Sequence, residues 1–177
     1  MGLGAKYQFQ GRHEHSLDSK FRLAIPVSFR EVMDALGSPS LWVTNGERWL
    51  EVYPAQEWER FMASLNTAPK YNKQARVLKM FYASSAQEMV LDVQGRILIP
   101  KSLRDTAKLN RDVIIVGVGA TIQIWDRGIW QDAFDQARPN FEDYISSLSE
   151  VREPKEEGAV VRQAHHAQDE PKDGDAT

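Results

Sequence analysis

The chain has 177 residues, of which 42% are hydrophobic and 27% are charged, and it contains no cysteine. This composition predicts a folded globular protein of one or two small domains, and it excludes collagen-like and disulfide-dependent classes. The absence of cysteine also excludes thiolate nucleophiles and cysteine-based zinc sites, and it suits a reducing cytoplasm. No apolar stretch approaches the roughly 20 residues that cross a bilayer, so we expect a cytoplasmic protein without a membrane partner.

Charge is distributed unevenly along the chain, although the net charge is only −3. Residues 151–177 contain four basic and seven acidic residues, which accounts for the whole excess of acid. Basic residues dominate 1–30 and 66–80 instead, so the net charge does not argue against a nucleic-acid partner. The segment 151–177 is polar and lacks hydrophobic periodicity, which predicts a disordered C-terminal tail.

The chain contains an internal repeat. Residues 17–31 align with residues 91–105 at an offset of 74, and seven of the fifteen positions are identical. Each copy places a turn, over 18–21 or 92–95, before a short strand that leads into Ile-Pro. The sequence therefore predicts one architecture that is built twice.

The first half begins with an extended segment over residues 7–16, followed by the first turn and a short strand. Pro26 is typical of the first turn of a helix, and Gly37 is typical of the end of one. Asn45-Gly46 predicts a hairpin between flanking strands. An apolar stripe over 55–65 predicts a helix that completes the half.

The second half repeats this order. An extended segment over 86–91 precedes the second turn, Pro100 begins a helix, and Gly119 marks a hairpin. Two further helices are expected around Pro139, which breaks the helical pattern. The predicted fold class is α+β, in which two half-repeats over 7–65 and 86–150 are joined by a linking helix over 66–85 and followed by the tail.

A charged pair occurs at the same place in both copies, as Asp18-x-x-x-Arg22 and Asp92-x-x-x-Arg96. Two interpretations stay open. In the structural one, each aspartate forms the turn, with help from Gly95 in the second copy, and pairs with its arginine at the surface. In the functional one, each guanidinium binds phosphate bidentately or reads guanine O6 and N7, which suits a DNA duplex.

The arginines favour the functional interpretation because further cations cluster around both motifs. We therefore expect Arg22 and Arg96 to contact DNA, together with five nearby donors: Arg12, Lys20, Arg30, Lys101 and Arg104.

The doubled Asp-x-x-x-Arg motif, each copy leading into Ile-Pro and a helix, resembles the MraZ family of bacterial regulators over about residues 11–151. The resemblance implies a SpoVT/AbrB-like swapped-hairpin β-barrel with flanking helices, formed by both half-repeats, and ring-shaped homo-oligomers. It also implies sequence-specific binding to double-stranded promoter DNA upstream of a cell-division and cell-wall gene cluster, autoregulation, and a nucleoid-associated location. Neither enzymatic activity nor a cofactor is implied.

Carried over by position, Arg22 and Arg96 are the expected DNA contacts of the family, with Lys20 beside the first. One departure is visible, since the family usually has glycine before this arginine. Gly95 fits that pattern and Phe21 does not. Because a phenylalanine does not readily take a positive φ, we expect either a reshaped first turn or packing of Phe21 against a neighbour.

Two other classes of function compete with DNA binding. An enzyme is disfavoured because His13-x-His15 lacks a third metal ligand, Gly117-x-Gly119 lacks the rest of a nucleotide loop, and no residue set resembles a catalytic site. An oligomeric scaffold or antitoxin-like protein of the same fold remains the alternative. The basic face of the linking helix is either a solvated surface or a further DNA contact.

Overall fold

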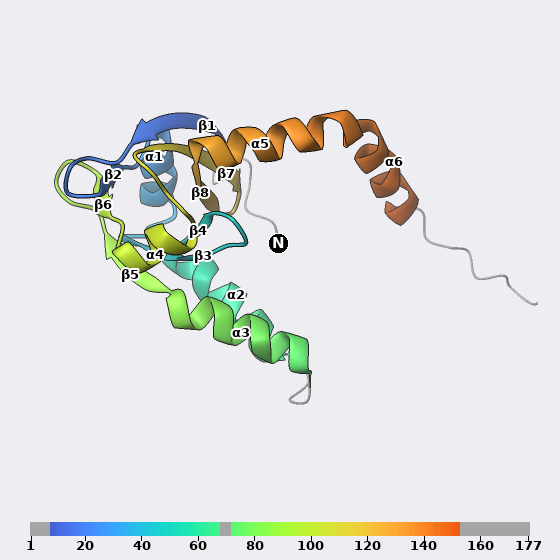
Figure 1. The fold of residues 1–177 in the computed structure, drawn as a ribbon. Helices are drawn as coiled ribbons and strands as arrows, with labels where there is room; N and C mark the ends of the chain where they lie inside the picture. Colours follow the sequence, from blue (N-terminus) through green and yellow to red (C-terminus); the bar gives the residue numbers. More distant parts are fainter. Residues whose placement is uncertain (1–7, 68–71, 153–177) are drawn as a thin grey trace, which may run out of the picture. The chain divides into compact units, whose positions relative to one another are not determined.

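The computed structural model describes residues 8–67 and 72–152 of an α+β protein (Figure 1). The first half contains β1 (Phe9–Ser16), β2 (Arg22–Ala24), α1 (Val27–Ala35), β3 (Ser40–Asn45), β4 (Leu50–Pro54) and α2 (Ala55–Thr67). The second half contains β5 (Gln87–Val90), β6 (Arg96–Leu98), α4 (Lys101–Thr106), β7 (Asp112–Gly119), β8 (Ile122–Asp126) and α5 (Arg127–Ala137). Between them lies α3 (Lys73–Ser85), and the 3-10 turn η2 (Arg138–Asn140) precedes α6 (Phe141–Arg152). The predicted order of strand, turn, strand, helix and hairpin is confirmed in both halves.

The two halves exchange their first strands. Six antiparallel strands form one sheet in the order β1-β7-β8-β4-β3-β5, so β1 pairs with the hairpin of the second half and β5 pairs with the hairpin of the first. The two short strands β2 and β6 form a separate antiparallel pair. Because β1 and β5 remain at the edges of the larger sheet, the predicted closure into a barrel is not confirmed.

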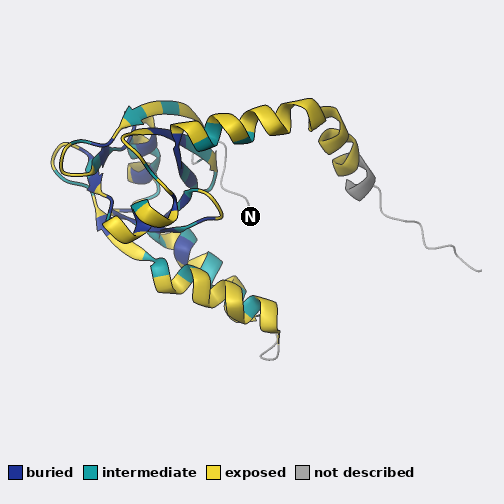
Figure 2. Cartoon of the chain, viewed as in Figure 1, coloured by how far each residue is buried: buried dark blue, intermediate teal, exposed yellow. Residues whose placement is uncertain are grey.

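The buried residues, dark blue in Figure 2, come from both halves. Their side chains form one hydrophobic core. Leu23 of β2 and Ile97 of β6 lie opposite each other in the strand pair and are 0% and 1% exposed. Phe9 of β1 packs edge-on against Phe29 of α1, with ring centroids 5.5 Å apart. The inner face of the β2–β6 pair is therefore anchored in the core, which fixes the opposite face toward solvent.

Helices α1 and α4 start and stop in equivalent ways. Pro26 and Pro100 precede their first residues, as the sequence predicts, because a first helical turn does not need the missing N–H. Gly37 follows α1 with a φ of 62°, and Lys108 takes the corresponding left-handed conformation after α4 with a φ of 51°. No glycine marks the second site, where the backbone N–H groups of Lys108 and Leu109 donate to the carbonyls of Asp105 at 3.2 Å and Arg104 at 2.9 Å.

The helical region around Pro139 divides as predicted, with η2 between α5 and α6. The chain separates into two compact units, of which the second begins at Pro139, and α6 belongs to that second unit. The predicted tail over 151–177 falls outside the described residues except for Val151 and Arg152, which end α6. None of the described helices combines the length and the apolar character that a bilayer crossing requires.

Candidate nucleic-acid interface

The first turn is organised by the carboxylate of Asp18. Its Oδ1 accepts hydrogen bonds from the backbone N–H groups of Lys20 at 2.8 Å and Arg22 at 2.9 Å, and its Oδ2 accepts one from Arg22 Nε at 2.7 Å. The backbone N–H of Asp18 in turn donates to the carbonyl of Arg22 at 3.0 Å. Donation from the Arg22 backbone is the main reason that the pKa of Asp18 is lowered. The turn therefore holds the arginine by its Nε.

The second turn has the same construction. Asp92 Oδ1 accepts from the N–H groups of Gln94 at 2.9 Å and Arg96 at 3.0 Å, while Oδ2 accepts from Arg96 Nε at 2.9 Å and Nη2 at 2.7 Å. Hydrogen bonding from the Arg96 side chain lowers the pKa of Asp92 to about 2. Both aspartates are thus ionised at neutral pH and orient a guanidinium, so the structural role holds whether or not these arginines also bind a ligand.

The two arginines project from the same face of the β2–β6 pair. Arg22 lies opposite Leu98, and Ala24 lies opposite Arg96, while the alternate residues of each strand are buried. Side chains of directly opposed residues share one face of an antiparallel pair, so Arg22, Arg96 and the half-exposed Leu98 face solvent together. The side chains of Arg22 and Arg96 are 33% and 22% exposed. Two guanidinium groups from distant parts of the sequence therefore share one surface.

Phe21 takes a left-handed backbone conformation, with a φ of 61°, as Gly95 does with a φ of 73°. The first turn is not reshaped, and Phe21 instead packs against a neighbour, as the second alternative predicted. A left-handed conformation of a non-glycine residue is unfavourable by about 1–3 kcal/mol, and surrounding contacts must offset it. The guanidinium of Arg104 supplies one such contact, because its Cζ lies 3.4 Å from the centroid of the Phe21 ring.

Arg30 occupies the equivalent place beside the second turn. A Cβ added to Gly95 would lie 2.8 Å from both Cδ and Nη1 of Arg30, so this side chain packs directly on the glycine. Arg30 and Arg104 are related by the repeat offset of 74. Each half therefore places one arginine against the turn of the other half. The alignment of the two copies pairs Arg30 with Arg104 and Phe21 with Gly95. It does not show that each arginine contacts the turn of the other half.

The remaining predicted cations are more dispersed. Lys20 is exposed within the first turn, whereas Arg12 lies in the middle of β1 opposite Val116. Lys101 forms an ion pair with Asp105 one helical turn further along α4, at 2.5 Å. The structure thus brings Lys20 to the two turn arginines and leaves Arg12 and Lys101 on other elements.

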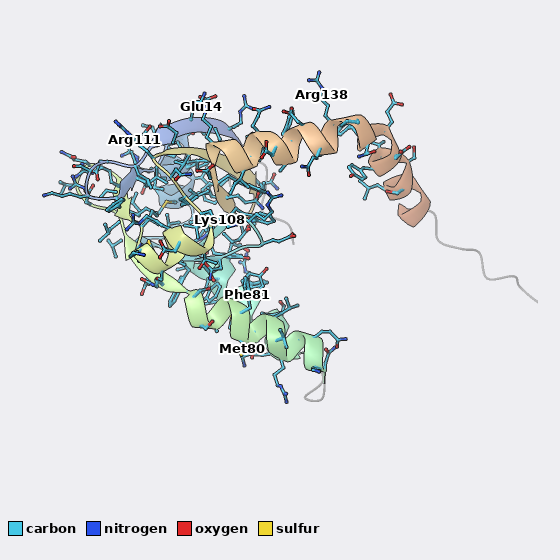
Figure 3. The ribbon with its side chains drawn as sticks, in the orientation of Figure 1. Glu14, Met80, Phe81, Lys108, Arg111 and Arg138 are labelled. Carbon is cyan, nitrogen blue, oxygen red and sulfur yellow. The ribbon has the colours of Figure 1, made fainter. Side chains whose placement is uncertain are left out.

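One further basic residue near the first turn belongs to neither repeated motif. Arg111, labelled in Figure 3, is exposed, and its carbonyl accepts a hydrogen bond from Leu17 N at 2.8 Å. It helps to line a cleft of about 530 Å³ with Phe21 and residues of the turn. It lies outside the repeated motif, so only the three-dimensional contact could reveal it.

Among residues 8–67 and 72–152, His13 and His15 have no third side chain beside them that would complete a metal site. Their ring centroids are 6.5 Å apart, and the His13 ring packs edge-on against Phe29 at 5.0 Å. Burial and the neighbouring His13 lower the pKa of His15. Within the described part of the chain, no group of three or more potential metal-binding side chains comes together.

A family model described as "MraZ protein, putative antitoxin-like" matches the chain twice, over residues 8–81 and 82–149. The chain belongs to the MraZ family. It is 36% identical over 141 residues to the transcriptional regulator MraZ of Thermoanaerobacter sp., covering 80% of this chain and 96% of that protein. It is 37% identical over 140 residues to that of Heliobacterium modesticaldum and 38% identical over 141 residues to that of Pediococcus pentosaceus, covering 79% of this chain and 96% of each relative. Membership in the MraZ family places the chain among transcriptional regulators and not among enzymes.

Proposed function

We propose that this chain is a sequence-specific DNA-binding regulator whose two turns contact the duplex through Arg22 and Arg96. The observation that carries the proposal is the projection of both guanidinium groups from one face of the β2–β6 pair. A two-stranded ribbon fits the major groove of B-DNA, where a guanidinium can bond to guanine O6 and N7 or to a phosphate. Side chains that are already oriented by Asp18 and Asp92 lose less conformational entropy on binding.

The charge around the turns supports an anionic partner. Two aspartates offset the charges of Arg22 and Arg96, and Asp34 lies in the same pocket as Arg30, which leaves Lys20, Arg104 and Arg111 as excess positive charge near the two turns. We assign Lys20 to a phosphate beside the first turn, and Arg12 and Lys101 to more distant phosphates. Such contacts would release counterions and make the affinity depend on salt.

The proposed target is the promoter upstream of a cell-division and cell-wall gene cluster that includes the protein's own gene. Its support is the MraZ resemblance together with relatives that are named transcriptional regulators. A protein with this role acts in the cytoplasm at the nucleoid.

The proposed assembly is a homo-oligomeric ring. We propose that the half-repeats over 7–65 and 86–150, joined by the segment 66–85, form a swapped-hairpin unit, because β1 and β5 are exchanged between the halves. Helix α3 exposes four large apolar side chains, which a second copy could cover: Val77, Leu78, Met80 and Phe81. Several copies on one assembly would engage repeated DNA sites together, which raises the overall affinity.

An oligomeric scaffold or antitoxin-like protein is the second candidate. The same exposed apolar face of α3 favours it, since that face could also bind another protein. The difference between the two candidates lies in whether DNA binds at the turns.

Footprinting on DNA upstream of the protein's own gene tests the proposal. Protection of short direct repeats by the wild-type protein, with loss of protection for Arg22→Ala and Arg96→Ala, is the expected result. An assembled wild-type protein that binds this region no better than random duplex at low salt would overturn the proposal. The scaffold or antitoxin-like role would then be the remaining candidate.

A further inference from the structure

Phe21 and Arg104 are joined by three consecutive contacts. The backbone N–H of Ile99 donates to the Phe21 carbonyl at 3.0 Å, and Arg104 Nε donates to the Ile99 carbonyl at 3.1 Å. The guanidinium of Arg104 then lies over the Phe21 ring at 3.4 Å. Backbone and side chain of Phe21 are therefore both tied to the second half of the chain.

The equivalent place in the other turn is built differently. Ile25 N donates to the Gly95 carbonyl at 2.9 Å, which repeats the first of these contacts. Arg30 packs on Gly95 directly, however, and its Nε is buried without a hydrogen-bond partner. Gly95 also needs no partner to hold a positive φ, whereas Phe21 does. The two turns thus share a conformation that is maintained by different means.

These contacts separate the role of Arg104 from that of Arg22. Arg104 Nε is engaged by a carbonyl of its own chain, and one face of its guanidinium is covered by Phe21. Arg22 directly follows Phe21 in the first turn. A change in the backbone of Phe21 would therefore redirect Arg22 first.

We propose that Arg104 is a positioning residue for DNA binding: its flat guanidinium, stacked on Phe21, holds the first turn in the left-handed conformation that presents Arg22. This inference rests on the proposed DNA-binding function. In this role Arg104 does not contact DNA. Both the planar shape and the charge of its guanidinium are required to hold the first turn. A lysine at this position keeps the charge but cannot stack as a planar group or keep the Nε bond to Ile99.

The test is Arg104→Lys in the full-length protein, measured by gel shift on DNA upstream of its gene. The variant should bind about five-fold more weakly than the wild type if the stacked pair is lost. In an Arg22→Ala background the same substitution should have no further effect on DNA binding, because Arg104 acts through Arg22. Its effect on urea unfolding should be equal in both backgrounds, and this comparison separates positioning from a general loss of stability.

A second pair of variants covers the case in which Arg104→Lys fails to fold. Phe21→Gly permits the same backbone conformation without the ring, so Phe21→Gly/Arg104→Lys should bind DNA as well as Phe21→Gly alone. Arg60→Lys is the matched control, since this exposed arginine of α2 is paired with Glu57 and lies outside both turns. Arg104→Lys binding like wild type, or an equal loss of affinity in the Arg22→Ala background, would overturn the inference. Failure of the wild type itself to bind would instead remove the proposed function.

Discussion

Arg96 of the second turn lies close to Asp18 of the first, with Nη1 3.7 Å from Oδ2. The two motifs are separated by 74 residues in the sequence, yet the antiparallel pairing of β2 with β6 brings them side by side. Asp18 therefore faces both arginines, at 2.7 Å from Arg22 and at the longer distance from Arg96. The two turns therefore form one surface that carries two guanidinium groups.

Loss of either turn arginine should weaken DNA binding. Arg22→Ala and Arg96→Ala should each lower the affinity for specific DNA by about 1–3 kcal/mol per site, because a bidentate contact is removed. If the contact is to a phosphate, the slope of log K against log salt should also decrease by about one. Gel shifts at several salt concentrations measure both quantities. Light scattering should show an unchanged oligomer size, and unchanged affinity of Arg22→Ala would exclude the first turn from the interface.

Gly95→Ala should destabilise the protein more than Gly37→Ala does. Both glycines have a left-handed φ, but a Cβ at Gly37 meets no atom within 4 Å, whereas one at Gly95 meets Arg30 at 2.8 Å. Gly37→Ala carries only the backbone penalty, of about 1 kcal/mol, whereas Gly95→Ala must in addition displace Arg30. Urea unfolding of the two variants measures the difference. Equal losses of stability would show that Arg30 moves aside freely.

Glu51 should make the protein less stable as pH rises. Burial raises the pKa of its carboxyl above the ordinary value of 4.5, although Trp49, Thr121 and Gln123 donate hydrogen bonds to it. A raised folded-state pKa gives a stabilising contribution that is complete below the unfolded-state pKa and is lost as pH rises through the folded-state value. Glu51→Gln should therefore flatten the dependence of unfolding free energy on pH above about pH 4.5. A wild type whose stability increases over this range, with no change in Glu51→Gln, would contradict the assignment.

Asp92 should give the opposite dependence. Because its pKa is lowered to about 2 in the folded protein, its contribution is present above the unfolded-state pKa and is lost as pH falls through the folded-state value. NMR titration should find the Asp92 carboxyl ionised at pH 3. In Asp92→Asn the loss of stability at acid pH should be smaller than in the wild type, and Asp132→Asn serves as a control because Asp132 is exposed on α5, outside both turns. An ordinary titration of Asp92 near pH 4 would show that the Arg96 contacts are not maintained in solution.

The exposed apolar face of α3 should contribute to self-association. Leu78 is 46% exposed, and Leu78→Glu places a charge where a second copy would have to bury it. Analytical ultracentrifugation should show smaller assemblies for this variant. Its loss of DNA affinity relative to the wild type should be larger on DNA with several binding sites than on DNA with one site. Ala83→Glu, an exposed position on another face of α3, should leave the assembly intact. Unchanged assembly of Leu78→Glu would place the interface elsewhere.

Local patterns predicted many of the elements correctly, because each depends on residues that are close in sequence. Pro26 and Pro100 precede their helices, and the Asn45-Gly46 signal falls at the end of β3, in the connection to β4. The candidate site was predicted less completely. The doubled motif identified Arg22 and Arg96, but the contact between Phe21 and Arg104 joins residues 83 apart and has no local pattern.

The sequence by itself determined that the chain is built twice from one plan, that each copy contains an aspartate turn followed by an arginine, and that the resemblance is to the MraZ family. Only the tertiary structure decided that each half completes the other: β1 pairs with β7, β5 with β3, and β2 with β6. Side-chain alternation specifies which face of a strand is buried but not which distant strand will pair with it. That choice depends on packing of both halves around one core. The pairing of β2 with β6 also brings Ile99 and Arg104 of the second half against Phe21, which holds a conformation that its own residue type disfavours.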